Sequence, residues 1–388
     1  MKEAGKVFSR SSSRRRFLWK GVAAAGAATA AGMAIPGSMF PRDRDDDRDH
    51  GPLSKGDIAI LRLLSAAEQI ETDLWQQYSE LGGVQDSEVS GVGGGNLIYA
   101  AALGLLDADM PQYVHDNTED EISHHNFLNN YLEAKGAPGV DLSPFATLPS
   151  SQATGARQVG RLTNLTQLTV DTSWWTRYRS ATNPDLGAKF DNAVPSLAKG
   201  KFTAIPRTNA DLGSSFLSQD NSKSIDDRLK AIAFTAGFHF AFIEQGGTSL
   251  YATLAQQVTS LEVLRILLSI GGSEIMHFQT WQDKAGNATP LTFTDPVNKS
   301  TVTFMDLAQN QPEDLQANLI MPEPCDFLDK RLGPVAIIRP TTPRNSGARA
   351  AIQGFVDDGL FIGQNDPNFL TKVFALADEA DQARRQLR

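Results

Sequence analysis

The sequence predicts a mainly α-helical fold built around a four-helix bundle. Three observations support this prediction. Four segments repeat their apolar residues with the 3.6-residue period of a helix; three begin with capping residues and one with a first-turn proline. Each has a glutamate within its apolar stripe, and the four helices form two similar pairs. With 388 residues, 41% of them hydrophobic and 21% charged, the chain has the composition of a folded protein.

The first predicted helix spans residues 54–81, where Ser54 and Asp57 form a capping box. Its apolar stripe contains two glutamates, Glu68 and Glu71, among leucines and aromatic residues. Carboxylates on the buried face of a helix are costly, so their presence there requires a chemical reason.

The second predicted helix spans 111–136, after an Ala- and Leu-rich run at 96–106 that predicts a separate short helix. It begins with proline and ends at glycine, as helices commonly do. Its stripe contains Glu121, followed by His124 or His125. A glutamate and a histidine three residues apart share one face of a helix.

The third predicted helix runs from 224 through 254 and the fourth over 259–285, and each begins at a Ser or Thr followed three residues later by an acidic residue. The stripe of the third contains Glu244, and that of the fourth contains Glu274 and His277. Because the chain has only 14 glutamates against 31 aspartates, these positions are not scattered surface charges.

The two pairs of helices resemble each other in sequence. EQIETDLW in the first helix aligns with EQGGTSLY in the third, and DEISHHNFL in the second aligns with SEIMHFQTW in the fourth. Glu68 therefore matches Glu244, the two Glu-x-x-His motifs match each other, and Trp75 matches Tyr251. This alignment indicates two copies of one helical hairpin.

Four glutamates that face one another in a core would repel, whereas two divalent cations would balance their charge. Two imidazoles would complete the coordination of such a pair of ions. The predicted ligands are Glu68, Glu121, His124, Glu244, Glu274 and His277. Further candidates, as ligands or as neighbours of ligands, are Glu71, His125, Tyr251 and Trp75. The alternative interpretation is a set of hydrogen-bonded polar pairs in a bundle without metal.

These motifs resemble those of the ferritin-like superfamily, and in particular a family of exported ferritin-like proteins related to plant desiccation-associated proteins. The resemblance covers residues 54–136 and 224–286. It implies a dinuclear iron or manganese centre, without distinguishing the two metals. It also implies oxidative chemistry with O2 or peroxide, which could oxidise iron, remove peroxide or oxidise a small molecule. A non-catalytic, stress- or desiccation-protective envelope protein on the same scaffold is the alternative, so catalysis itself stays open.

The N-terminal residues 1–34 resemble a twin-arginine signal peptide, with SRRRFL followed by an Ala- and Gly-rich run. A charged linker is predicted at 35–53. We therefore expect recognition by the twin-arginine translocase, export to the periplasm, envelope or medium, and no membrane span after cleavage.

Charge and cysteine content exclude other classes of protein. Residues 1–34 contribute +6 to the net charge of −9, so the remainder carries −15, which disfavours binding to nucleic acid. A single cysteine, Cys325, excludes an internal disulfide and a cysteine-rich metal site. Neither property decides whether the protein is a homodimer.

The predicted domain organisation places the bundle at 54–286, with a long insertion at 137–223 between its second and third helices. Residues 287–388 are predicted to form a C-terminal extension packed on the bundle. This extension contains an alternating segment at 291–304, typical of a β-hairpin, and a closing helix at 366–386.

Overall fold

The computed structural model describes residues 51–89, 91–174, 194–218, 223–307, 331 and 346–386. The predicted signal peptide, most of the predicted linker and Cys325 lie outside the described residues. The chain divides into two units, Met1–His50 and Gly51–Arg388, and all described elements belong to the second.

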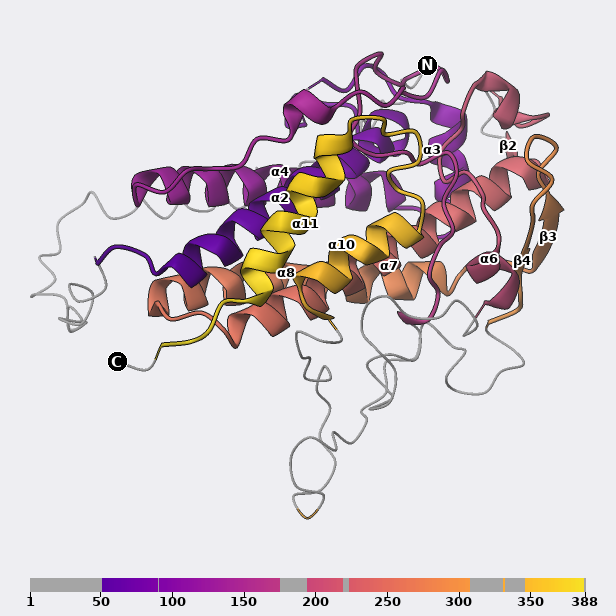
Figure 1. Ribbon diagram of the computed structural model, residues 1–388. Helices are drawn as coiled ribbons and strands as arrows, with labels where there is room; N and C mark the ends of the chain where they lie inside the picture. Colours follow the sequence, from indigo (N-terminus) through magenta and orange to yellow (C-terminus); the bar gives the residue numbers. More distant parts are fainter. Residues whose placement is uncertain are drawn as a thin grey trace, which may run out of the picture. The chain divides into compact units, whose positions relative to one another are not determined.

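The mainly α class is confirmed (Figure 1). The described α-helices are α2 (Lys55–Gly82), α3 (Leu97–Leu103), α4 (Met110–Ala134), α6 (Pro195–Lys199), α7 (Asp227–Ala255), α8 (Leu261–Ala285), α10 (Ala348–Asp357) and α11 (Pro367–Asp381). Short 3₁₀ turns occur at Ser143–Phe145 and Asn209–Leu212. The described strands form two small antiparallel sheets, β1 (Phe216–Leu217) with β2 (Lys223–Ser224) and β3 (Leu291–Thr294) with β4 (Thr301–Phe304).

The four longest helices pack in the pairs expected from the repeat, α2 along α4 and α7 along α8. Aromatic side chains join the two pairs. The Trp75 ring of α2 stacks on Phe240 of α7, with centroids 4.9 Å apart, and on Trp281 of α8, at 5.4 Å. Helix α7 is buried on almost all sides, whereas α4 buries one stripe and exposes the rest. This difference explains the nearly continuous apolar sequence of α7.

The N-terminal cap of the first long helix was predicted correctly from the sequence, whereas that of the third was not. As predicted, the Ser54 side chain accepts a hydrogen bond from the Asp57 backbone N–H at the start of α2. The predicted cap of α7 was wrong. Asp226 accepts from the Leu229 N–H at 3.2 Å, while Ser224 lies in β2, whose pairing determines where the helix can begin.

The cap of α8 is also one residue later than predicted, at Ser260 rather than Thr259. The reason is a tertiary contact with the first helix. The Asp57 carboxylate accepts hydrogen bonds from the backbone N–H groups of Thr259 and Ser260, at 2.8 and 3.1 Å. Asp57 thus ties the beginning of α8 to the beginning of α2.

The described parts of the insertion, 137–174, 194–218 and residue 223, include a segment that is anchored on α2. Arg161 forms a buried ion pair with Glu80. The Asp73 carboxylate accepts hydrogen bonds from the backbone N–H groups of Leu162 and Thr163, at 3.0 and 2.9 Å. These contacts fix the insertion against the side of α2.

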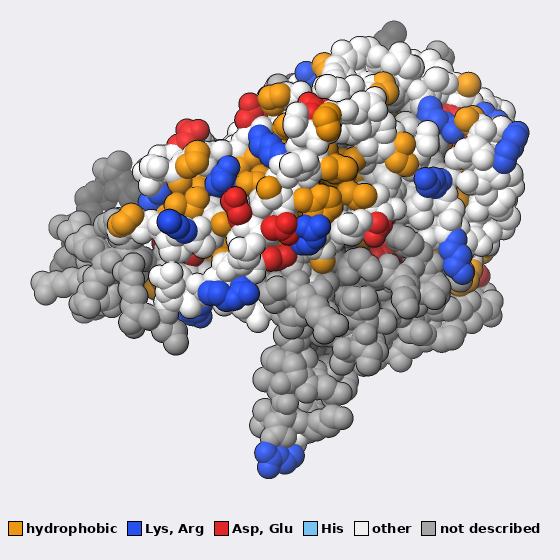
Figure 2. Space-filling view, in the orientation of Figure 1, with side chains coloured by type: hydrophobic (Ala, Val, Ile, Leu, Met, Phe, Trp, Pro, Cys, Tyr) orange, Lys and Arg blue, Asp and Glu red, His pale blue; other side chains and the backbone are white. Residues whose placement is uncertain are grey.

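Within the described part of the C-terminal region, the predicted β-hairpin is confirmed and the predicted closing helix forms over Pro367–Asp381. The β-hairpin forms with Leu291 opposite Phe304, and α11 packs against α2 and α10 (Figure 1). On the face shown in Figure 2, acidic and basic side chains are interspersed with apolar groups. No described helix combines the length and the apolar character that crossing a membrane requires.

His239 of α7 is a buried histidine, and its burial makes the free energy of unfolding depend on pH in the acid range. Its Nδ1 lies 2.7 Å from the Tyr78 hydroxyl, and burial lowers the pKa of His239 to about 3. Between pH 6.5 and 3 the unfolded chain therefore binds a proton that the folded protein does not, so stability present above pH 6.5 is lost as the pH falls.

We expect His239→Asn to reduce the slope of unfolding free energy against pH in this window by up to about 1.4 kcal/mol per pH unit. Asparagine retains a polar partner for Tyr78. Denaturant unfolding of wild type and variant at several pH values measures the slope, and identical slopes would show that His239 does not contribute.

Candidate metal centre

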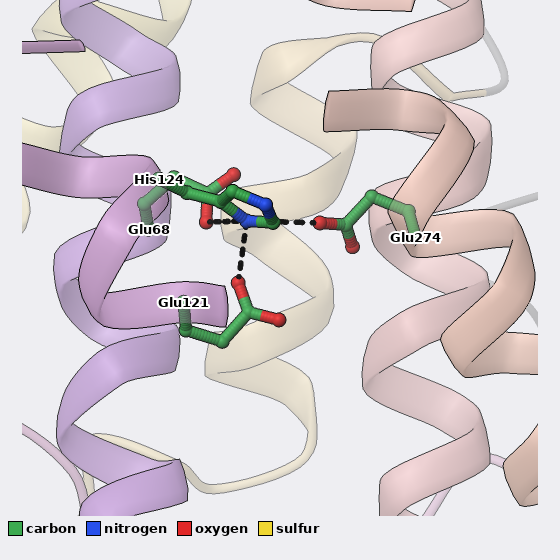
Figure 3. Close-up of side chains that lie close together, drawn as sticks. All are labelled: Glu68, Glu121, His124 and Glu274. Carbon is green, nitrogen blue, oxygen red and sulfur yellow. Dashed lines mark hydrogen bonds and ion pairs between the residues drawn. The ribbon is translucent and has the colours of Figure 1, made fainter. Parts of the chain in front are cut away.

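The structure brings all six predicted ligands together between the two helix pairs, in two groups that could each hold a metal ion. The first group surrounds His124 of α4 (Figure 3). Its Nδ1 lies 3.1 Å from a carboxylate oxygen of Glu121, 3.3 Å from Glu68 and 3.7 Å from Glu274. Three helices, α2, α4 and α8, therefore supply this group.

The second group surrounds His277 of α8 and also contains Glu121, Glu244 and Glu274. The Nδ1 of His277 lies 3.1 Å from Glu244 and 3.4 Å from Glu121. Glu121 and Glu274 thus belong to both groups, one from each Glu-x-x-His motif. Shared carboxylates between two ligand groups are the arrangement that a dinuclear centre requires.

The outer nitrogen of each imidazole is held by the other half of the repeat. His277 Nε2 lies 3.1 Å from the Asp120 carboxylate, which can only accept a hydrogen bond when ionised. His124 Nε2 lies 3.1 Å from the Ser273 hydroxyl, whose own proton is donated to the Ile270 carbonyl. Both histidines therefore donate through Nε2, and in the neutral form both direct the Nδ1 lone pair into the centre.

Asn117, one turn before Glu121 on α4, is a buried residue of the site that the sequence interpretation missed. Its amide nitrogen donates to Glu121 and to Glu244, at 2.9 and 2.8 Å. Its amide oxygen accepts from the Trp281 indole N–H at 2.8 Å, which fixes the orientation of the amide because indole can only donate. Asn117 thus orients one carboxylate from each helix pair.

Two of the further candidates, Tyr251 and Trp75, line the site in different ways. The Tyr251 hydroxyl donates a hydrogen bond to Glu68, and burial together with the Glu68 charge raises the pKa of Tyr251 well above its usual range. Trp75, the matching residue of the first hairpin, has an indole nitrogen without a hydrogen-bond partner. Its ring forms part of the aromatic wall described above, so it is not placed as a ligand.

The other two candidates, Glu71 and His125, are not in either ligand group. His125 Nδ1 bonds the Thr72 hydroxyl at 3.0 Å, so the structure selects His124 as the inward histidine. Glu71 is buried, and burial and repulsion from Glu68, Glu121 and Glu244 hold its pKa well above the usual range. Glu71 therefore lies close enough to the centre to affect its charge.

Gly247 aligns with Glu71 in the repeat, and the structure explains the difference. A Cβ atom at Gly247 would lie 2.1 Å from a carboxylate oxygen of Glu274. Glycine at this position of the second hairpin therefore leaves room for the shared carboxylate where it lies. The first hairpin places a carboxylate of its own at the equivalent position.

Crowding of buried charges shifts the proton equilibria of the metal-free site. Burial, with repulsion from Glu244 and Glu68, raises the pKa of Glu121 to about 7, and that of Glu274 is raised well above its usual range. Burial disfavours the charged form of His124, but the neighbouring Glu68 and Glu121 carboxylates raise its pKa to about 10. Metal binding at neutral pH must therefore displace protons from this site.

The residues present fit a pair of cations, as their unsatisfied atoms show. Both carboxylate oxygens of Glu274 and one of Glu68 are buried without a hydrogen-bond partner. Buried polar oxygens are normally hydrogen-bonded or bound to metal. The same Glu274 carboxylate lies in the space that Gly247, which has no side chain, leaves open. The donor set, four carboxylates and two imidazoles, suits iron, manganese or zinc.

The chain matches no family model, no curated protein and no solved structure in the comparisons made. The fold and the site therefore define a mainly helical protein with buried Glu and His groups that could hold metal ions.

Proposed function

We propose that the chain is an exported ferritin-like protein whose four-helix bundle, formed by α2, α4, α7 and α8, holds a dinuclear iron or manganese centre for oxidative chemistry. The observation that carries this proposal is the pair of groups sharing Glu121 and Glu274. Glu68 and His124 would complete the ligands of one ion, and Glu244 and His277 those of the other. When bound, two such ions supply the electrons for reducing O2 or peroxide.

The chain's own residues prepare this site in three ways. Asn117 holds Glu121 and Glu244 in position, and Asp120 and Ser273 hold the two imidazoles. The Tyr251 hydroxyl, bonded to Glu68, places a proton at the edge of the ligand set. The aromatic wall of α2, α7 and α8 excludes water on one side, which strengthens the electrostatic interactions within.

A cavity of about 760 Å³ between α4 and α8 supplies a route for an oxidant or small substrate to the His124 side of the centre. Its lining residues are Ser123, His124, Phe127, Tyr131, Glu262, Arg265, Ile266, Ser269 and Ile270. The lining combines four apolar or aromatic side chains with two serines and His124, and with Glu262 and Arg265 towards the end that begins α8. Such a mixed lining suits a small molecule with apolar and polar groups or an uncharged oxidant.

The test of the proposed function is metal analysis of purified mature protein produced with iron or manganese supplied. We expect about two ions per chain, together with consumption of O2 or peroxide. Fewer than one ion per chain would overturn the dinuclear centre. Two ions without consumption of either oxidant would overturn catalysis and favour a stress-protective scaffold.

Blocking the cavity provides a separate prediction. We expect Ser269→Trp to lower the rate of oxidant consumption several-fold while bound metal stays unchanged, because Ser269 is exposed, lines the cavity and belongs to neither ligand group. Leu268→Trp is the matched control, since Leu268 is 61% exposed on the same helix and outside the cavity. Equal rates in the two variants would show that the substrate enters elsewhere.

A further inference from the structure

His115, near the beginning of α4, is a completely buried histidine outside the dinuclear centre. Its side chain is 1% exposed, and both ring nitrogens lack a hydrogen-bond partner. Buried imidazoles are normally hydrogen-bonded, so this one requires an explanation. From the helical rise of 1.5 Å per residue, it lies roughly 9 Å along the helix axis from Glu121.

The Nε2 atom of His115 points towards three carboxylates. It lies 3.6 Å from Asp86, 3.7 Å from Glu88 and 3.9 Å from Glu119. These separations are too long for hydrogen bonds. They are within a few tenths of an ångström of the roughly 3.4 Å that separates two ligands of a tetrahedral ion with bonds of about 2.0–2.1 Å.

The segment carrying two of these carboxylates is docked against α4. The Val84 N–H donates to the Pro111 carbonyl at 3.1 Å, and Val89 is buried. Within the segment, the Glu88 N–H donates to the Asp86 carboxylate at 2.8 Å, which turns both acidic side chains to the same side. The loop after α2 and the first turns of α4 thus bring possible metal ligands close to one point.

We propose that Asp86, Glu88 and His115 form a separate mononuclear site for a divalent cation, with zinc as the metal best suited to it. The Glu119 carboxylate lies near the same nitrogen of His115 and adds a further negative charge. Two or three carboxylates around one imidazole favour a dication over an uncharged ligand. A bound ion would connect the loop that ends the first helix to the second helix, and would stabilise that junction. The competing explanation is a protonated His115 paired with carboxylates, which needs no metal.

The experiment compares zinc binding by two full-chain variants that lose the same charge. Asp86→Asn with Glu88→Gln removes two proposed ligands, while Asp357→Asn with Glu379→Gln changes exposed acids on α10 and α11. Both variants retain the dinuclear centre, so its contribution cancels. After incubation with zinc and gel filtration, we expect one zinc ion fewer per chain in the first variant and a smaller zinc-induced rise in its Tm.

Equal zinc content and equal Tm shifts in the two variants would overturn the proposal and leave the ion-paired imidazolium as the explanation. His115→Gln provides a second test, because it removes the buried imidazole, a proposed zinc ligand, and leaves the surface carboxylates in place. Asp86 and Glu88 are partly exposed, with side chains 41% and 32% accessible, so their substitution tests the site even where the His115 variant does not fold.

Discussion

Replacing Glu121 and Glu274 together by glutamine is expected to reduce bound metal from two ions per chain to less than one. Both carboxylates belong to both ligand groups, so the double substitution removes two ligands from each proposed ion site. The metal-free protein is expected to be at least as stable as wild type, because the change relieves repulsion among buried carboxylates. Elemental analysis and denaturant unfolding measure the two effects.

The matched control is Glu133→Gln with Glu379→Gln, which changes the same number of charges at exposed positions. It should retain both ions. Metal content that is equal in the two double variants would remove Glu121 and Glu274 from the ligand set. A strong loss of stability in the metal-free Glu121/Glu274 variant would instead indicate that the carboxylates serve the fold.

Adding one methyl group at Gly247 is expected to weaken metal binding by about 10- to 100-fold, the range seen when the surroundings of metal ligands are disturbed. The new Cβ atom would meet the Glu274 carboxylate at 2.1 Å and force it away from the centre. Glycine to alanine in a helix otherwise adds up to about 1 kcal/mol of stability. A loss of metal affinity in Gly247→Ala would therefore come from the displaced carboxylate, and metal titration of the purified variant measures it.

Gly272→Ala is the control for this effect. Gly272 lies two residues before Glu274 on α8, and a Cβ atom there would meet nothing within 4 Å. We expect this variant to bind metal as wild type does. Equal affinity in the two glycine variants would mean that Glu274 has room to move and that the glycine is not needed for binding.

The sequence predicted the helices and the inward glutamates well because both depend on local periodicity. A glutamate in an apolar stripe is visible without any knowledge of its neighbours, and Glu68, Glu244 and Glu274 are all buried as that pattern requires. The repeat added the pairing of helices. The choice between His124 and His125 required the structure, because both lie near the same edge of one helix.

Features that depend on contacts between distant segments could not be predicted in the same way. The cap of α8 shifted because Asp57 of another helix binds the backbone there. Asn117 has a weak signal, since it lies four residues before Glu121 on the same stripe, but its link to Glu244 crosses between helices. In the repeat, Asp120 aligns with Ser273, and two such different residues give no common signal in the sequence, yet each contacts the histidine of the other hairpin.

That last pair of contacts makes the two halves of the site chemically unequal. An imidazole that donates to a carboxylate acquires partial imidazolate character, whereas one that donates to a hydroxyl does not. His277, bonded to Asp120, is therefore the stronger electron donor of the two, and His124, bonded to Ser273, the weaker. Of two bound cations, the one held by His277 would therefore be bound more tightly than the one held by His124, so removing the Asp120 carboxylate should weaken metal binding more than removing the Ser273 hydroxyl.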